Sequence, residues 1–278
     1  MSLLKLFAPF CDSKAFGGSE HYPAREQGQT VGRSLLAGRL RLSVLPARLI
    51  ATMTAWFPAL AGNPGEGAAR GTTLIAPLTI RPARMDDIHA ILALHREAFA
   101  DKFGSAFGSA GAERGMAALA SAWQRQGASA LRGMFVAEYQ QQIIGTTTVR
   151  TWEMGGDNSG AAELAFHEEL GLFGAARSLF ALSLLDHRIQ RGEGFVTDVA
   201  VLAPYRRSGV ARALLARAEQ EARLRGKRFL GLYVAARNDA AQRLYRSLGF
   251  ATVRVRRSLL AWLIFGQGRW YYMRKDLL

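Results

Sequence analysis

The sequence "VTDVAVLAPYRRSGVARALLARAEQ" spans residues 196–220 and decides the fold of this chain. Its first part is a run of apolar and β-branched residues, which predicts a strand over 195–201. A turn follows at Pro204. Small and apolar residues then recur at helical spacing, which predicts a helix over 210–225 that Gly226 ends. The segment therefore predicts a strand, a tight turn and a helix in immediate succession.

A turn of this kind favours anion binding. It exposes backbone N–H groups at the helix start, where the helix dipole is positive. Gly209 has no Cβ, so phosphate oxygens can approach the main chain closely, and Ala211 is almost as small. Arg206 and Arg207 add positive charge. The residues alone leave an ordinary strand–helix turn as the alternative, since the segment has neither a Walker lysine nor the three spaced glycines of a dinucleotide site.

The pattern around this segment predicts an α/β (α+β) fold, in which helices cover a mixed sheet. Asp86 or Asp87 is placed to cap the first helix, whose inner face includes His95. Before residue 196 we expect a strand over 78–83, helices over 88–99 and 112–126, a hairpin over 133–152 and a helical insertion over 163–189. After residue 220 we expect a strand over 229–234, a helix over 239–247 and two final strands.

Several motifs in register give the chain a resemblance to a known family. Arg206-Arg207-Ser208-Gly209-Val210-Ala211 fits the pattern Arg/Gln-x-x-Gly-x-Gly/Ala. It follows Val199-Ala200-Val201 and precedes Asn-x-x-Ala at 238–241 and Leu-Tyr-x-x-x-Gly-Phe at 244–250. In this order the motifs resemble the GNAT N-acetyltransferase superfamily. The similarity covers roughly residues 78–275 and is densest over 195–250.

The resemblance implies a fold and a cofactor site. The fold is a mostly antiparallel central sheet flanked by helices, with a helical insertion before the cofactor-binding strand. Acetyl-CoA would place its pyrophosphate on the turn and its pantetheine arm along the strand, and no metal is implied. The residues implied to bind the cofactor are Val199, Ala200, Val201, Arg206, Arg207, Ser208, Gly209, Val210, Ala211 and Asn238.

The resemblance also implies direct attack of an amine on the thioester, which needs a proton for the departing thiolate and an acceptor for the amine proton. Tyr245 stands where family members place the acid; packing of its helix is the alternative. Asp198 is the best candidate for the base or for an anchor of the amine; capping a loop is the alternative. Some members that acetylate protein N-termini carry a Glu where this chain has Tyr233. The resemblance implies that the insertion builds part of the substrate wall. Five of its polar residues are interpreted as solvated helix residues, with a catalytic role as the alternative: His167, Glu168, Glu169, Asp186 and His187.

Composition bears on the cellular compartment of the protein and on its N-terminal segment. The chain has 278 residues, a net charge of +14 and a single cysteine, Cys11, so no intramolecular disulfide can form. A reducing compartment, the cytoplasm, is the natural interpretation, and no segment has the roughly 20 clean apolar residues of a membrane span. Residues 1–76 are rich in arginine and poor in acids, which is typical of an organelle transit peptide but also of a poorly ordered extension or a mis-assigned start. We expect the folded domain over 77–278.

The function predicted is acetyl-CoA-dependent transfer of an acetyl group to a primary amine of a small molecule or a protein. The alternative is a non-catalytic acyl-CoA-binding regulatory module on the same fold. Specific nucleic-acid binding is not expected, because the arginines are dispersed and not interleaved with aromatic residues. The apolar segment 258–273 is interpreted as a buried pair of strands; a hydrophobic substrate pocket, a homodimer contact or a membrane-facing patch is the alternative.

Overall fold

The structure is a computed structural model that describes residues 74–98, 112–154, 161–183 and 187–277. Almost all of the predicted N-terminal segment 1–76 and the glycine-rich loop 103–111 lie outside these ranges. The boundary expected after residue 76 therefore stays a prediction. The first described residues contact the sheet, since the backbone N–H groups of Ile75 and Ala76 lie 3.2 and 3.4 Å from the hydroxyl of Tyr139.

A seven-stranded sheet runs through the described part of the chain in the order β1-β2-β3-β4-β5-β7-β6. Only the β4–β5 pair is parallel, so the predicted mixed, mostly antiparallel sheet is confirmed. The strands are β1 (Thr79–Pro82), β2 (Met134–Tyr139), β3 (Gln142–Thr151), β4 (Glu193–Val201), β5 (Phe229–Ala235), β6 (Ala251–Arg257) and β7 (Arg269–Asp276). Every residue of β4 and β5 is buried, as expected for central strands of a covered sheet.

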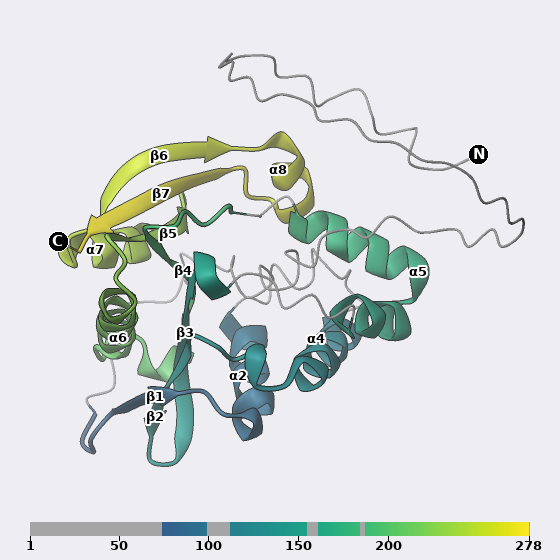
Figure 1. The fold of residues 1–278 in the computed structure, drawn as a ribbon, viewed down its shortest axis with the longest axis horizontal. Helices are drawn as coiled ribbons and strands as arrows, with labels where there is room; N and C mark the ends of the chain where they lie inside the picture. The colour runs from purple at the N-terminus through teal and green to yellow at the C-terminus, as the bar shows by residue number, and fades with distance from the viewer. Residues whose placement is uncertain (1–73, 99–111, 155–160, 184–186, 278) are drawn as a thin grey trace, which may run out of the picture. The chain divides into compact units, whose positions relative to one another are not determined.

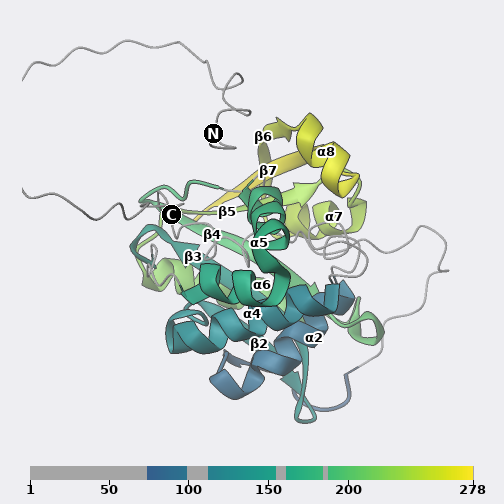
Figure 2. The same cartoon turned by 90° about the vertical axis from the view of Figure 1, so that its right-hand side faces the viewer.

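Helices lie on both sides of this sheet (Figure 1). On one side α2 (Ile88–Ala98), α4 (Ala112–Gln126) and α5 (Ala161–Ser183) form a layer, which Figure 2 shows from the front. On the other side lie α6 (Val210–Leu224) and α7 (Asp239–Ser247). The predicted helical insertion is confirmed as α5, which precedes β4 and changes direction at Gly171, where φ is 68°.

Small residues bring α6 close to the sheet. Ala218 and Ala222 of the helix are fully buried, and a Cβ built on Gly194 of β4 would lie 2.8 Å from the Cβ of Ala222. A Cβ on Gly145 of β3 would lie 3.0 Å from a methyl group of Val210. The start of α6 is therefore fixed against the centre of the sheet.

The apolar segment 258–273 differs from the expected pair of buried strands. Leu259–Phe265 forms a helix, α8, whose residues Leu259 and Leu263 are 86% and 74% exposed. Ser258 caps this helix by accepting a hydrogen bond from the Ala261 N–H at 3.1 Å, and Gly266 ends it with φ 63°. The two cap residues favour a short helix here, although the apolar composition of the segment had suggested a buried strand. Among the described helices none is both long and apolar enough to cross a membrane.

Candidate active site

The turn before α6 presents a row of backbone donors. Arg207 and Gly209 both have positive φ, 66° and 89°, on either side of Ser208. In the described part of the chain, the backbone N–H groups of residues 207–212 donate to no backbone carbonyl. Alternation of left-handed and right-handed residues turns successive N–H groups toward one side and forms a concave anion site. These six donors lie at the positive end of α6.

The side chains of the turn support this backbone shape. The Nε of Arg206 donates to the carbonyl oxygen of Val201 at 3.2 Å, and the hydroxyl of Ser208 donates to the backbone carbonyl oxygen of Tyr205 at 2.5 Å. Arg207 is exposed, whereas Val210 points into the core. A Cβ on Gly209 would meet no atom within 4 Å, so the structure needs glycine there for its φ and leaves open space above the donors.

Strands β4 and β5 part beside this turn. Their parallel pairing ends at Val196 and Leu232, although β4 continues to Val201 and β5 to Ala235. The register of β4 on β3 shifts at the same level, because Thr148 pairs with Asp198 but Val149 pairs with Val196. This leaves Thr197 as the extra residue of a bulge. The expected pantetheine-binding residues, 199–201, thus lie on an edge of β4 that β5 does not pair.

Tyr245 of α7 lies near this opening. Its side chain is buried, and burial together with the negative charge of Asp198 raises the pKa of its phenol well above the usual value. No described residue makes a hydrogen bond with its hydroxyl group. The structure therefore brings the two predicted catalytic residues, Tyr245 and Asp198, into one electrostatic environment.

Asp198 has a partner that the sequence did not reveal. His95 of α2 places its Nε2 3.6 Å from Oδ2 of Asp198, and both side chains are almost fully buried. The hydroxyl of Thr197 donates to Oδ1 at 2.8 Å, while Oδ2 has no hydrogen-bond partner among the described residues. A buried carboxylate oxygen without a partner requires a ligand, a proton or a water molecule. The only signal in the sequence was a histidine on the apolar face of a helix.

Asn238 has a structural role. It is the N-cap residue of α7, and its side-chain oxygen accepts a hydrogen bond from the Ala241 N–H at 3.0 Å. This cap holds the helix that carries Tyr245. Its expected contact with the cofactor stays a prediction.

A second polar cluster lies on the face of the sheet opposite α6 and α7. The carboxylate of Glu193, at the start of β4, is fully buried and accepts hydrogen bonds from the Tyr272 hydroxyl at 2.6 Å and the Gln190 N–H at 3.0 Å. His187 Nε2 lies 3.0 Å from the same carboxylate. Burial and the charge of Glu193 raise the pKa of the Tyr272 phenol. We call Glu193, His187 and Tyr272 the glutamate cluster.

The position of His187 corrects one expectation. It was interpreted as a solvated helix residue, but α5 ends at Ser183 and the His187 side chain is only 6% exposed. Its ring stacks on Phe195 with centroids 4.2 Å apart. His167, Glu168 and Glu169 do lie on α5, and Asp186 lies outside the described residues.

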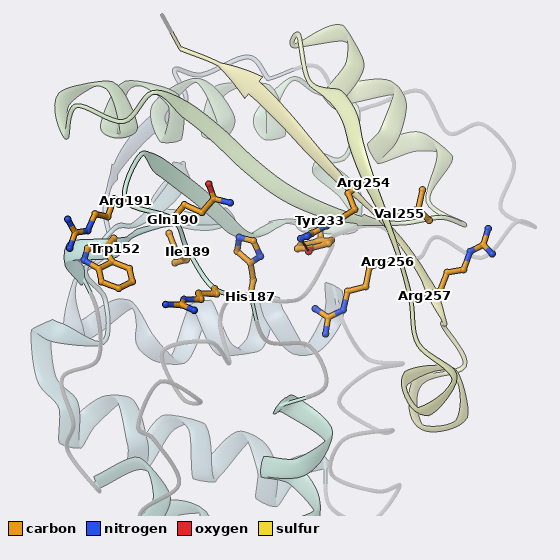
Figure 3. Close-up of a pocket in the computed structure, with 11 residues that line it drawn as sticks. Trp152, His187, Ile189, Gln190, Arg191, Tyr233, Arg254, Val255, Arg256 and Arg257 are labelled. Atoms are coloured by element: carbon orange, nitrogen blue, oxygen red, sulfur yellow. Dashed lines mark hydrogen bonds between the residues drawn. The ribbon is translucent and has the colours of Figure 1, made fainter. Parts of the chain in front are cut away.

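A cavity of about 930 Å³ opens over the glutamate cluster (Figure 3). His187 and Tyr233 lie at its centre, Trp152 and Arg191 on one side, and residues of β6 on the other. Tyr233 directly follows Leu232, the last residue of β5 that pairs with β4. The cavity therefore reaches the level at which the two strands part. Its size suits a small organic ligand.

Comparison with known proteins finds acetyltransferases among the proteins that this chain resembles. The model of the acetyltransferase (GNAT) family matches residues 92–250, more than half of the chain. A curated relative, the uncharacterized N-acetyltransferase YycN of Bacillus subtilis (strain 168), is 43% identical over 58 residues. That match spans 21% of this chain and 37% of YycN, so the chain covers little more than a third of this relative.

A solved structure of an acetyltransferase shares the fold. This structure, described simply as an acetyltransferase, has a TM-score of 0.53 and 22% identity, and the match covers 72% of this chain and all of the other. PaiA N-acetyltransferase from Thermoplasma acidophilum, solved in complex with coenzyme A, has a TM-score of 0.46 and 13% identity over 72% of this chain and 99% of its own. The predicted family and fold are confirmed: this chain belongs to the acetyltransferase (GNAT) family.

Proposed function

We propose that the chain is an acetyl-CoA-dependent N-acetyltransferase that moves an acetyl group directly to a primary amine. The observation that carries the proposal is the row of six backbone donors at residues 207–212, which lies beside the opening between β4 and β5. A pyrophosphate needs several N–H donors and positive charge. The backbone of the turn supplies the donors, and Arg206 and Arg207 supply the charge. The extended arm of the cofactor needs an unpaired strand edge, which β4 supplies at 199–201.

Acetyl-CoA supplies a thioester whose carbonyl carbon an amine can attack, so that a C–N bond forms as the C–S bond breaks. Tyr245 suits the role of acid, because its phenol carries a proton at neutral pH and its side chain lies near the opening between β4 and β5. Asp198 suits the role of proton acceptor, because its Oδ2 accepts no hydrogen bond from a described residue. The proton that Asp198 takes up replaces the one that Tyr245 gives away, so the site ends each cycle unchanged.

His95 supports Asp198 in this scheme. It stands 3.6 Å from the same oxygen and its ring meets Trp123 edge-on, with centroids 6.2 Å apart. We assign it a positioning role: it holds the carboxylate in place from the α2 side.

The cytoplasmic location and a homodimer remain predictions.

The test separates transfer from binding. Acetylation of an amine panel is followed by release of the CoA thiol, and acetyl-CoA affinity is measured on the same preparations of the full chain. Tyr245→Phe should bind acetyl-CoA normally but lower kcat by about 100-fold or more, the usual contribution of an acid in the transition state. Tyr271→Phe, which removes a phenol from β7, is the matched control and should keep full activity. Normal affinity with no transfer by the unmutated chain would instead identify a non-catalytic binding module.

A further inference from the structure

Five arginines line the cavity over the glutamate cluster, and among the described residues no aspartate or glutamate does. They come from two directions: β6 carries Arg254, Arg256 and Arg257, and the segment before β4 carries Arg188 and Arg191. In the part of the chain that the structure describes, Arg188, Arg191, Arg254 and Arg257 form no ion pair with a carboxylate. Arginine stays protonated in proteins, so like charges converge on this space.

Aromatic side chains hold some of these arginines in place. The guanidinium of Arg254 donates to the hydroxyl of Tyr233 at 3.1 Å and lies 5.7 Å from the centre of the Tyr272 ring. Arg191 lies 5.9 Å from the centre of the Trp152 ring. A charged group that is held by its neighbours loses less entropy when a ligand binds. The arginine side of the cavity is thus prepared for an anion.

The floor of the cavity has the opposite character. The carboxylate of Glu193 lies beneath it, and the ring of His187 separates this carboxylate from the open space. The floor also lies nearest the level at which β4 and β5 part, because Tyr233 follows the last paired residue. A ligand that carries both an amine and an anionic group therefore fits the charges around the cavity.

We propose that this cavity binds the acceptor, and that the acceptor is a small primary amine that also carries a phosphate or carboxylate group. Its anionic group contacts Arg254 and Arg256, and its amine lies toward the opening between β4 and β5 and the reacting thioester. This inference rests on the proposed function, since it names the substrate class of the same enzyme.

The experiment compares pairs of amines in which one member carries an anionic group that its partner lacks, with the full chain and saturating acetyl-CoA. The pairs are O-phosphoethanolamine with ethanolamine, 4-aminobutyrate with 4-aminobutanamide, and the peptide Ser-Asp-Glu with Ser-Asn-Gln. We expect the anionic member of at least one small-molecule pair to have a kcat/KM about tenfold or more above its neutral partner, as one charge-assisted contact provides. A preference found only in the peptide pair would replace the small molecule with an acidic N-terminus and overturn that part.

Variants test whether the arginines cause the preference for the anionic amine. Arg254→Gln/Arg256→Gln should reduce the preference to about twofold or less, mainly through KM. Arg114→Gln/Arg228→Gln removes the same charge from α4 and from the residue before β5, outside the cavity, and should leave the preference intact. Acetyl-CoA affinity of each variant serves as the folding control.

Three results would overturn the inference: preference for the neutral member in every pair, an anion preference that survives in Arg254→Gln/Arg256→Gln, or transfer to no member of any pair. Each of these is compatible with normal binding of acetyl-CoA. Failure of the unmutated chain to bind acetyl-CoA would contradict the proposed function itself, so the two failures are distinguishable.

Discussion

Gly231 offers a sharp test of the glutamate cluster. A Cβ built at this position of β5 would lie 2.5 Å from Oε1 of Glu193 and even closer to the hydroxyl oxygen of Tyr272. Cβ atoms in proteins essentially never come within 3.0 Å of another atom, and both partners here are buried. Gly231→Ala must therefore displace the hydrogen bond between Tyr272 and Glu193.

The magnitude follows from two costs and one gain. Overpacking a core costs about 1–3 kcal/mol, and a buried hydrogen bond to a charged group contributes about 1.5–3 kcal/mol. Gly→Ala also lowers the conformational entropy of the unfolded chain, which raises the free energy of unfolding by about 0.4–1 kcal/mol. We expect Gly231→Ala to lower the free energy of unfolding by about 2–5 kcal/mol, which is a shift of about 1–2 M in the urea midpoint.

Urea unfolding followed by circular dichroism measures this loss. Gly192→Ala is the matched control, because the three atoms nearest to a Cβ there belong to the exposed guanidinium of Arg228, which can move. It should change stability by less than about 1 kcal/mol. Combining Gly231→Ala with Tyr272→Phe removes one colliding atom, so the double variant should lose less than the sum of the two single losses. Additive losses, or wild-type stability for Gly231→Ala, would refute the packing described here.

Three further predictions concern charge and capping. Arg81 lowers the pKa of Asp87 through hydrogen bonds of 2.7 and 2.9 Å, so this contribution to stability is present above the unfolded pKa of about 3.9 and is lost as pH falls. Asp87→Asn should therefore cost about 1–3 kcal/mol at neutral pH, and the difference from wild type in urea unfolding should vanish in acid. Tyr245 and Tyr272 have raised pKa values, so near-ultraviolet absorbance should show at most five of the seven tyrosines ionised at about pH 11 before unfolding begins. Ser258→Ala removes the cap of α8, and hydrogen exchange at Ala261 should become about five- to tenfold faster.

The sequence predicted the strand, turn and helix of the proposed cofactor site because their signals are local. The strand over 193–201, the turn and α6 follow one another directly, and each depends on residues a few positions apart. The hairpin over 133–152 was equally local: Gln140 and Gln141 form its turn with positive φ. Tyr245 lies on a short helix with recognisable ends.

The glutamate cluster and the His95–Asp198 pair depend on contacts between residues that are distant in the sequence. Tyr272 meets Glu193 across 79 residues, and His95 reaches Asp198 from another element. No periodicity encodes such pairs. The segment 259–265 was misjudged for a different reason, since a short apolar run fits a strand and a buried helix equally well. Ser258 and Gly266, its caps, were the better guide.

The central claim is that the turn before α6 binds the phosphates of acetyl-CoA, and calorimetric titration of acetyl-CoA into the full chain tests it most directly. Gly209 and Gly226 stand just before and just after α6, both have positive φ, and a Cβ on either meets no atom within 4 Å. Gly209→Glu and Gly226→Glu thus impose the same strain and charge at opposite ends of one helix. We predict that Gly226→Glu binds acetyl-CoA like the wild type, whereas Gly209→Glu binds about 100-fold more weakly or not at all. Equal affinity of the two variants would contradict the account.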